Sequence, residues 1–302
     1  MDISKNQKYR GRVQAVILDW AGTGVDHGCF GPIEPIVRAF AEQGVRLEIS
    51  EARGPMGMAK KDHIRTLLAD PNIAGRWLAA QKRPPDEGDV GTVYKQAEKH
   101  MLRTVADYAT PVPGAVEALR EFRSMDLKIG SCTGYTSAMM KTVTESAAAL
   151  GYAVDCTLTA DMVGGKGRPF PFMIYENAVR LGVWPLEAII KIGDTPVDIQ
   201  EGLNAGVWTI GVTHSGSHVG LSREELAALS PAAQAEKTVA AERILKDAGA
   251  HFVVPYLSDC AELIAKINRN LEAGLTPAAS SAFQNATVCA SGTITSKPSS
   301  PV

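Results

Sequence analysis

The 302-residue sequence predicts an α/β protein whose core is a doubly wound parallel sheet and which carries an inserted α-helical cap domain. Two observations predict this fold class. Short apolar runs rich in β-branched residues alternate along the chain with amphipathic stretches, which is the pattern of a parallel sheet covered by helices. The alternation is interrupted once, after the first run, by a long interval that shows only helical patterns.

Five apolar runs indicate buried parallel strands of a Rossmann-like core. They have the sequences VQAVIL, LKIGS, AIIKI, VWTIGV and HFVVP and cover residues 13–18, 127–131, 188–192, 207–212 and 251–255. Three stretches between them, AVEALREFRSM, SAMMKTVTESAAALG and PFMIYENAVRLG, have apolar residues at helical spacing. Gly151 and Gly182 are placed as the C-terminal stops of the last two helices.

The long interval after the first strand predicts the cap. PIEPIVRAFAEQG, AKKDHIRTLLAD and GTVYKQAEKHMLRTVADY each show an apolar stripe, and the proline-rich break KRPPDEG separates the last two. We therefore expect a helical cap over residues 28–108 and a core domain made of residues 1–27 and 109–273. Residues 274–302 are rich in Ala, Ser, Thr and Pro and contain a single charge at Lys297, so we expect a disordered tail.

Charge and cysteine content restrict the partners and the compartment. A formal net charge of -2 provides no strong field toward nucleic acid or an anionic membrane, so a small-molecule substrate is expected. The five cysteines include no CxxC pair, which argues against a disulfide framework or a zinc site and favours the reducing cytoplasm. The polar N-terminus and the absence of a membrane-length apolar run predict neither secretion nor membrane insertion.

Polar residues follow three of the expected strands at the point where each strand ends. DWAGTG places Asp19 after the first run, SCTGYT places Thr133 after the second, and GDTPVDIQEG places Asp194 after the third. Ligands of open parallel sheets bind outside the carboxyl ends of the strands, so these side chains should converge. Pro196 suits a first helical position and puts Asp198 in the first turn. Carboxylates so placed suit a hard divalent cation.

A lone aspartate after a strand is usually a helix cap, but the combination is more specific. D-W-A-G-T, S-C-T-G and G-D-x-x-x-D after successive strands resemble the haloacid dehalogenase (HAD) superfamily of aspartate-nucleophile phosphotransferases, over about residues 13–264. The resemblance implies a HAD-like core, with the helical insert as its cap, and Asp19 as the nucleophile that forms an aspartyl-phosphate. It also implies Mg²⁺ on Asp19, the backbone carbonyl of Ala21, and Asp194, with Asp198 supporting the metal from behind.

The same resemblance implies that Thr133 and Arg168, in KGRPFPF, bind the phosphoryl oxygens. One position departs from the pattern of ordinary phosphatases in this superfamily. They have a second aspartate two residues after the nucleophile, as general acid for the leaving alkoxide, and Ala21 stands there. The chemistry therefore needs no such acid or recruits one elsewhere. Lys60, in the insert segment PMGMAKKDH, could instead form a Schiff base with a carbonyl substrate.

These features are similar to those of the phosphonoacetaldehyde hydrolase family, the phosphonatases. That family has Trp-Ala-Gly-Thr after the nucleophile, a cysteine ten residues beyond the aspartate, and a Pro-Met-Gly-x-x-Lys-x-Asp-His motif in its cap, and all three are present. The resemblance implies that Lys60 is the Schiff-base lysine, with Cys29, Met56 and His63 as active-site neighbours and Tyr135 close to the imine. It also implies cleavage of the C–P bond of phosphonoacetaldehyde to acetaldehyde and phosphate.

The chemistry places two further demands on this segment. Lys60 must be neutral when it attacks a carbonyl, so burial or a nearby cation should lower its pKa. His63 lies three residues later on the same helical face, where it could shuttle protons. Taken singly, Lys60 would be read as a solvated helix residue and His63 as a packing histidine; their registration with Asp19 favours the functional interpretation.

Two other functions remain as alternatives. One is a HAD phosphatase or phosphotransferase that acts on a small phosphate ester, which Ala21 and Lys60 disfavour. The other is a catalytically silent binding protein, which the intact set of acids disfavours. Two details depart from the family pattern: Gly24 replaces a second threonine, and the loop with Lys166 looks longer and more basic. A homodimer is expected, with the apolar helices of the insert as one available face.

Overall fold

Six parallel strands form the central sheet of the structure, a computed structural model that describes residues 8–278. In spatial order the strands are β3 (Cys156–Thr159), β2 (Lys128–Thr133), β1 (Ala15–Leu18), β4 (Ile189–Gly193), β5 (Trp208–Val212) and β6 (Phe252–Val254). Every neighbouring pair is parallel. The predicted doubly wound α/β core is confirmed, and each of the five predicted strands is present within a few residues of its expected bounds.

β3 was not predicted from the sequence. It is a four-residue edge strand, CTLT, whose first two residues are half-buried, and it pairs with β2 through Gly130 and Cys156. Its side chains alternate between polar and apolar without a continuous apolar run. An edge strand with one covered side does not need the apolar run that marks a central parallel strand.

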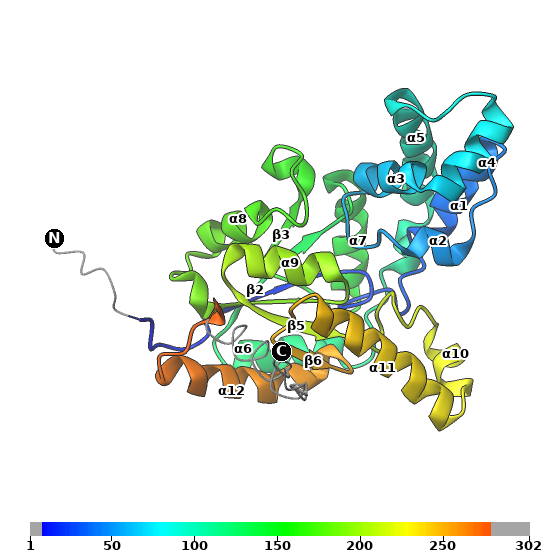
Figure 1. Cartoon of the computed structure of the whole chain (residues 1–302). Helices are drawn as coiled ribbons and strands as arrows, with labels where there is room; N and C mark the ends of the chain where they lie inside the picture. The colour runs from blue at the N-terminus through cyan, green and yellow to red at the C-terminus, as the bar shows by residue number, and fades with distance from the viewer. Residues whose placement is uncertain (1–7, 279–302) are drawn as a thin grey trace, which may run out of the picture.

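Helices cover both faces of the sheet (Figure 1). One layer consists of α6 (Ala115–Ser124), α7 (Ser137–Ala149) and α12 (Cys260–Glu272), and the other of α8 (Phe172–Leu181), α9 (Pro196–Ala205) and α11 (Pro231–Asp247). The short helix α10 (Arg223–Ala228) precedes α11. Single 3-10 turns lie at η1 (Val105–Tyr108), η2 (Ala160–Val163), η3 (Leu186–Ala188) and η4 (Leu257–Asp259).

The central strand β1 shows why its sequence is uninterruptedly apolar. Val16 and Leu18 pack into the cluster shared with α6, α7 and α12, whereas Ala15 and Ile17 pack into the cluster shared with α8. All four side chains are fully buried. Successive residues of a strand point to opposite faces, so a strand covered on both faces must be apolar at every position.

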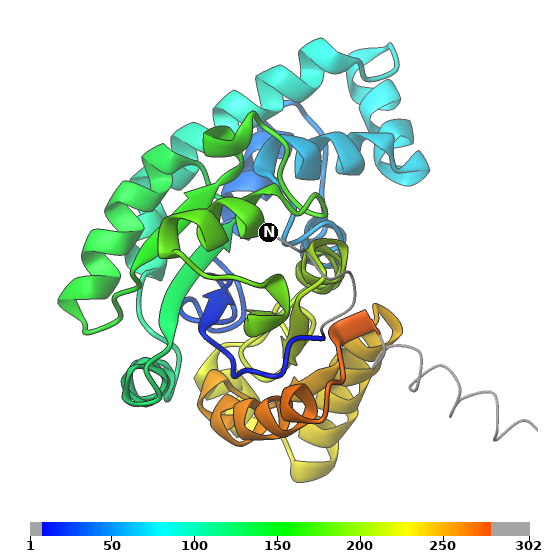
Figure 2. The same ribbon diagram turned by 90° about the vertical axis from the view of Figure 1, so that its left-hand side faces the viewer.

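The interval between β1 and β2 is helical, as predicted. It contains α1 (Ile33–Glu42), α2 (Ile49–Arg53), α3 (Lys60–Ala69), α4 (Pro71–Gln81) and α5 (Glu87–Thr104). These helices gather at one end of the molecule, and α11 and α12 lie toward the other end (Figures 1 and 2). The proline-rich break falls between α4 and α5, as expected. The domain boundaries at residues 28 and 108 stay a prediction.

The two ends of the described chain bear on other expectations. Residues 274–278, the first of the expected tail, contact the core: Leu275 N–H donates to Asn270 O, and the carbonyl of Pro277 lies 2.9 Å from Nε2 of His251. The rest of the expected tail lies outside the described residues. No helix within residues 8–278 has both the length and the apolar character needed to cross a membrane.

Candidate active site

The carboxyl ends of β1, β2 and β4 border a small cavity beneath the insert. Asp19 directly follows β1, Thr133 ends β2, and Asp194 directly follows β4. The cavity has a volume of about 20 Å³, which is room for roughly one water molecule. Both the core and the insert contribute to its lining, which consists of Asp19, Ala21, Cys29, Met56, Gly57, Lys60, Thr133, Gly134, Tyr135, Arg168, Asp194 and Thr195.

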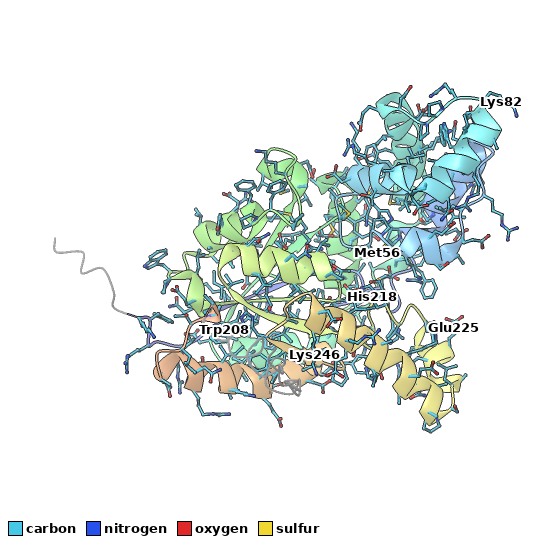
Figure 3. The ribbon with its side chains drawn as sticks, in the orientation of Figure 1. Met56, Lys82, Trp208, His218, Glu225 and Lys246 are labelled. Atoms are coloured by element: carbon cyan, nitrogen blue, oxygen red, sulfur yellow. The ribbon has the colours of Figure 1, made fainter. Side chains whose placement is uncertain are left out.

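The cavity brings together all the predicted site residues except His63 and Asp198. Met56 lies where the insert meets the core (Figure 3). Three further lining residues, Gly57, Gly134 and Thr195, were not predicted from the sequence. Residues more than 170 positions apart in the chain thus face one enclosed volume, because the first strand and the insert sit beside the later strands of the sheet.

Arg168 contacts the expected nucleophile from within the core. Its Nη2 lies 2.7 Å from Oδ1 of Asp19, and its Nη1 and Nε each lie 3.0 Å from a carboxylate oxygen, of Asp198 and Glu201 respectively. Burial disfavours the cation, but the attraction of Asp19 and Asp198 outweighs it and holds the pKa of Arg168 well above its usual range. Arg168 is therefore a fixed positive charge beside Asp19.

Lys60 begins α3 and points its amine into the cavity. The residue is 6% exposed, and Nζ lies 5.1 Å from the centroid of the Tyr135 ring. Burial lowers the pKa of Lys60 to about 8, although the nearby Asp19 carboxylate acts in the opposite direction. The lowered pKa agrees with the expectation from the sequence, because roughly a tenth of the amine is unprotonated at pH 7, far more than at the ordinary lysine pKa of 10.5.

His63 lies on α3 with Lys60 but does not line the cavity. Its side chain is fully buried behind the cavity, and Nε2 lies 2.8 Å from the carbonyl oxygen of Ala52. Burial, together with the charge of Lys60, lowers the pKa of His63 to about 3, so the imidazole stays neutral at physiological pH. His63 packs beside Lys60 on α3, and its Nδ1 has no hydrogen-bond partner among the described residues, so its part in proton transfer stays a prediction.

Asp194 is a buried carboxylate with one oxygen that has no hydrogen-bond partner among the described residues. Its Oδ2 accepts hydrogen bonds from the backbone N–H of Ser217, at 2.8 Å, and from Sγ of Cys29, at 3.5 Å. Its Oδ1 is buried without a hydrogen-bond partner among the described residues. Burial and the nearby Asp19 raise the pKa of Asp194 to about 8. A divalent cation would relieve both the repulsion and the unsatisfied oxygen.

Asp198 already has two cations. It is fully buried, and its Oδ1 lies 3.0 Å from Nη1 of Arg168 and 2.7 Å from Nζ of Lys191. Its Oδ2 accepts a hydrogen bond from Thr195, the N-cap of α9, and Pro196 is the first residue of that helix, as predicted. Ligand atoms of Asp19, Asp194 and Asp198 all lie within 4.8 Å of one another. These three carboxylates fit a hard cation. Asp198 already pairs with Arg168 and Lys191, so it would support such a cation without binding it directly.

Thr133 and Cys29 both line the cavity. Oγ1 of Thr133 accepts a hydrogen bond from the backbone N–H of Tyr135, at 3.2 Å, and a hydroxyl so engaged can still donate its own hydrogen to a ligand. Cys29 is fully buried at a φ of 56°. Burial and the charge of Asp194 raise the pKa of Cys29 well above its usual range, so its sulfur is a neutral thiol.

The loop before α3 fits closely against the core. A Cβ atom at Gly134 would overlap the carbonyl oxygen of Met58, and one at Gly57, whose φ is 86°, would overlap Oγ1 of Thr195. Nη1 of Arg168 also donates to the carbonyl of Gly57, at 3.2 Å. The insert therefore contacts the same arginine that holds the expected nucleophile.

The two departures from the family pattern have local explanations. The hydroxyl of Tyr152 occupies the space that a Cβ atom at Gly24 would need, and the Tyr152 ring packs edge-on against Trp20, with centroids 5.4 Å apart. Lys166 is exposed, and its Nζ lies 5.7 Å from the centroid of the Phe172 ring. Neither residue lines the cavity.

Two charged residues behind the cavity, Lys191 and Glu201, were not predicted from the sequence. Glu201 and Lys191 are fully buried, and Cys132 Sγ lies 3.3 Å from Oε2 of Glu201. Two signals were available. Lys191 interrupts the apolar run AIIKI, and Glu201 follows Asp198 at the three-residue spacing that puts two side chains on one helix face.

The class of the protein follows from the fold and from this site. The family model described as haloacid dehalogenase-like hydrolase matches residues 13–206, from the strand before Asp19 to the end of the helix that carries Asp198. A solved structure of a putative phosphoglycolate phosphatase from Lactobacillus delbrueckii subsp. bulgaricus has a TM-score of 0.61 at 20% identity, over 85% of this chain and 99% of that one. That likeness concerns the fold alone.

More similar proteins narrow the class. The phosphonoacetaldehyde hydrolase of Nitratidesulfovibrio vulgaris (strain DSM 19637 / Miyazaki F) is 46% identical over 90% of this chain and 97% of its own length. That of Lysinibacillus sphaericus is 41% identical over 86% and 97%. The crystal structure of a phosphonoacetaldehyde hydrolase like protein from Oleispira antarctica, 37% identical, has a TM-score of 0.88 over 92% of this chain and 100% of that one. The chain belongs to the phosphonoacetaldehyde hydrolase family of haloacid dehalogenase-like hydrolases.

Proposed function

We propose that this protein hydrolyses phosphonoacetaldehyde to acetaldehyde and inorganic phosphate. The observation that carries the proposal is the buried amine of Lys60 in the same small cavity as the carboxylate of Asp19. The named activity of relatives that match almost the whole chain supports the same substrate.

Cleavage of a carbon–phosphorus bond needs an electron sink. The bond has no oxygen leaving group, so simple displacement at phosphorus would expel a strongly basic carbanion. An imine one carbon away from the C–P carbon accepts the electron pair as an enamine. This chemistry does not require a general acid for an alkoxide, which agrees with an alanine at position 21.

Lys60 forms the imine in the proposed mechanism. Its unprotonated Nζ adds to the aldehyde carbon, and the resulting carbinolamine loses water to give a protonated imine. The lowered pKa of Lys60 supplies the neutral amine. Cys29 and Met56 line the cavity around the imine, and the ring of Tyr135 lies against Nζ, where its π face stabilises the cation.

Asp19 receives the phosphoryl group. Its carboxylate oxygen attacks phosphorus, the C–P bond breaks, and the electron pair of that bond moves into the iminium to form the enamine. Thr133 and Arg168 bind the phosphoryl oxygens as charge develops on them. Bound Mg²⁺, held by Asp19, Asp194 and the backbone carbonyl of Ala21, would offset the repulsion between a carboxylate and an anionic phosphoryl group.

Two hydrolyses complete the cycle. Protonation of the enamine carbon regenerates an imine, and water releases acetaldehyde and the free Lys60 amine. A second water cleaves the aspartyl-phosphate of Asp19 to phosphate. One water is released during condensation and two are consumed, so the net reaction consumes one.

The proposal is tested by comparing the wild type with Lys60→Arg. In the presence of Mg²⁺ and phosphonoacetaldehyde, the wild type should release acetaldehyde and phosphate in equal amounts, and borohydride should trap a reduced adduct on Lys60. Lys60→Arg keeps the positive charge but cannot form the imine, so release and trapping should both fall below detection. A wild type that is inactive on phosphonoacetaldehyde but hydrolyses phosphate esters would instead establish the alternative, a phosphatase of the same class.

Assembly, domain division and location form part of the same proposal. The expected cap at residues 28–108 closes over the core, and the protein acts in the cytoplasm.

We propose a homodimer formed through α8, where Phe172, Tyr175 and Val179 are exposed at the spacing of one helix face. Exposed apolar residues of the insert are instead spread over three helices, which favours the α8 face over the insert face.

A further inference from the structure

Lys191 lies where a lysine is least expected. It is the third residue of β4, between apolar neighbours on a central strand, and its side chain is fully buried. A buried ammonium group is costly unless opposite charges surround it, so Lys191 must have charged partners. It does not line the cavity, and no step of the proposed mechanism uses it.

The partners of Lys191 are the two carboxylates that also hold Arg168. Nζ of Lys191 lies 2.7 Å from Oδ1 of Asp198 and 3.7 Å from Oε2 of Glu201. Arg168 contacts the same two oxygens, each at 3.0 Å. The Asp198 and Glu201 side chains are 0% exposed, so water does not screen these charges. Two carboxylates are thus enclosed between two cations.

We infer that Lys191 is a positioning residue for phosphoryl transfer, which leaves the charge of Arg168 available to Asp19 and the phosphoryl group. The inference rests on the proposed function. Without Lys191, Arg168 alone would face both Asp198 and Glu201, and a net negative charge would lie directly behind the nucleophile. An anionic phosphoryl group approaching Asp19 would then meet additional repulsion in a region of low dielectric constant.

The same contacts fix the orientation of the guanidinium. Nε and Nη1 of Arg168 are used by Glu201 and Asp198, so Nη2 is directed at Asp19, 2.7 Å away. Lys191 offsets the repulsion between these two carboxylates, and the planar guanidinium stays in one geometry. Lys191 acts through these neighbours and does not touch the reacting atoms.

The test is a double-mutant cycle with Lys191→Met and Glu201→Gln. Lys191→Met removes the charge but keeps most of the length of the side chain, and Glu201→Gln removes the carboxylate that would then lack compensation. Each variant is assayed for borohydride trapping on Lys60 and, separately, for phosphate release at saturating phosphonoacetaldehyde with Mg²⁺. Trapping at saturating substrate reports imine formation, a step that precedes cleavage of the C–P bond.

Lys191→Met should trap normally but release phosphate roughly ten- to a hundredfold more slowly, the effect of one buried charge on a charged transition state. Adding Glu201→Gln should restore most of the rate, because the charges behind Arg168 balance again. Phosphate release by Lys191→Met within twofold of the wild type would overturn the inference. The inference would also be overturned if the loss of phosphate-release rate in the double variant equalled the sum of the losses, in free energy, of the two single variants.

Two further measurements keep the test decisive. The thermal transition shows whether Lys191→Met folds. If it does not, the double variant is compared with Glu201→Gln, and the inference predicts that the double variant folds and releases phosphate at most of the rate of Glu201→Gln. A much lower rate of phosphate release in the double variant would contradict the inference. The matched control is Lys246→Met with Glu242→Gln, an exposed Lys–Glu pair on α11 (Figure 3), which should leave the rate unchanged. A wild type that neither traps nor releases product would contradict the proposed function itself.

Discussion

At the scale of single residues, burial determines which groups react. Lys60 and His63 lie three positions apart on α3, yet burial gives them different uses. The amine of Lys60 faces the cavity with a pKa lowered to about 8, so in the proposed mechanism proton loss makes it a nucleophile. The imidazole of His63, with a pKa lowered to about 3, contacts a backbone carbonyl behind the cavity and stays neutral.

The pKa of Lys60 predicts the pH dependence of imine formation. Because the lowered pKa keeps the amine protonated below about pH 8, the rate of borohydride trapping should rise about tenfold per pH unit below that value. Above it the rate should level off. Trapping is measured between about pH 5.5 and 9.5 with saturating substrate. A rate that still rises about tenfold per pH unit up to pH 9.5, as the ordinary lysine pKa of 10.5 would give, would mean that the amine is not desolvated.

The sequence located most single residues of the site but not their partners. Asp19, Thr133 and Asp194 follow strands, and topology alone brings strand ends together, so their convergence could be predicted. The contacts among Arg168, Lys191 and Glu201 depend on how the loop before α8 meets β4 and α9. Such contacts arise between distant segments and leave no periodic signal in the chain.

At the scale of elements, the central strands and amphipathic helices were the predictable parts. β1, β4 and β5 are covered on both faces and therefore have continuous apolar sequences. β3 lies at an edge, where a short strand with two threonines suffices, and it was missed. Helices α2 and α4 of the insert were also not predicted individually, because α2 has only five residues and α4 directly follows α3 at Pro71.

The close approach of the insert loop to the core predicts the effect of Gly134→Ala. The added methyl group would overlap the carbonyl oxygen of Met58, so the loop that carries Lys60 must shift away from the core. Phosphate release should fall about a hundredfold, as for other displacements of about 1 Å in an active site. The thermal transition should change little, because Met58, whose carbonyl oxygen must move first, belongs to none of the buried hydrophobic clusters.

The matched control for that substitution is Gly91→Ala. Gly91 lies inside α5, and a Cβ atom there would meet nothing within 4 Å. The free energy of unfolding should increase by about 0.5–1 kcal/mol, since alanine favours a helix more than glycine does, and activity should not change. If Gly134→Ala released phosphate as fast as Gly91→Ala, the close contact between the insert loop and the core would not matter for activity, which would contradict the prediction.

At the scale of the whole molecule, a cation held by the acidic cluster would link metal binding to stability. Mg²⁺ that binds the folded chain only should raise the free energy of unfolding by about 2.7 kcal/mol at a hundredfold excess over its Kd. Because the pKa of Asp194 is raised to about 8, protons compete with the metal, and the stabilisation should decline as the pH falls below that value. Thermal unfolding with Mg²⁺ or with a chelator measures both effects.

Two variants separate a specific site from general charge effects. Asp194→Asn should abolish the Mg²⁺-dependent shift in Tm and the release of phosphate. Asp247→Asn, which removes an exposed carboxylate at the end of α11, should leave both unchanged. A full Mg²⁺ shift in Asp194→Asn would place the metal elsewhere.

The proposed dimer face is tested by introducing one charge at a time. Val179 on α8 is 74% exposed and Leu78 on α4 is 50% exposed. If α8 forms the interface, Val179→Glu should convert a two-chain species into single chains, and Leu78→Glu should not. Light scattering coupled to gel filtration reads the mass directly. The reverse result would restore the insert face expected from the sequence.

The small volume beneath the insert has a consequence for timing. A space for roughly one water is small for a phosphonate together with its aldehyde group, so we expect the cavity to widen when the proposed substrate enters. Each turnover should then include an opening in which the loop before α3 leaves Gly134 and Arg168, followed by a closure that excludes solvent again. The interval between catalytic events is thereby set partly by how often the molecule opens, and solvent viscosity should slow turnover even where the chemistry is fast.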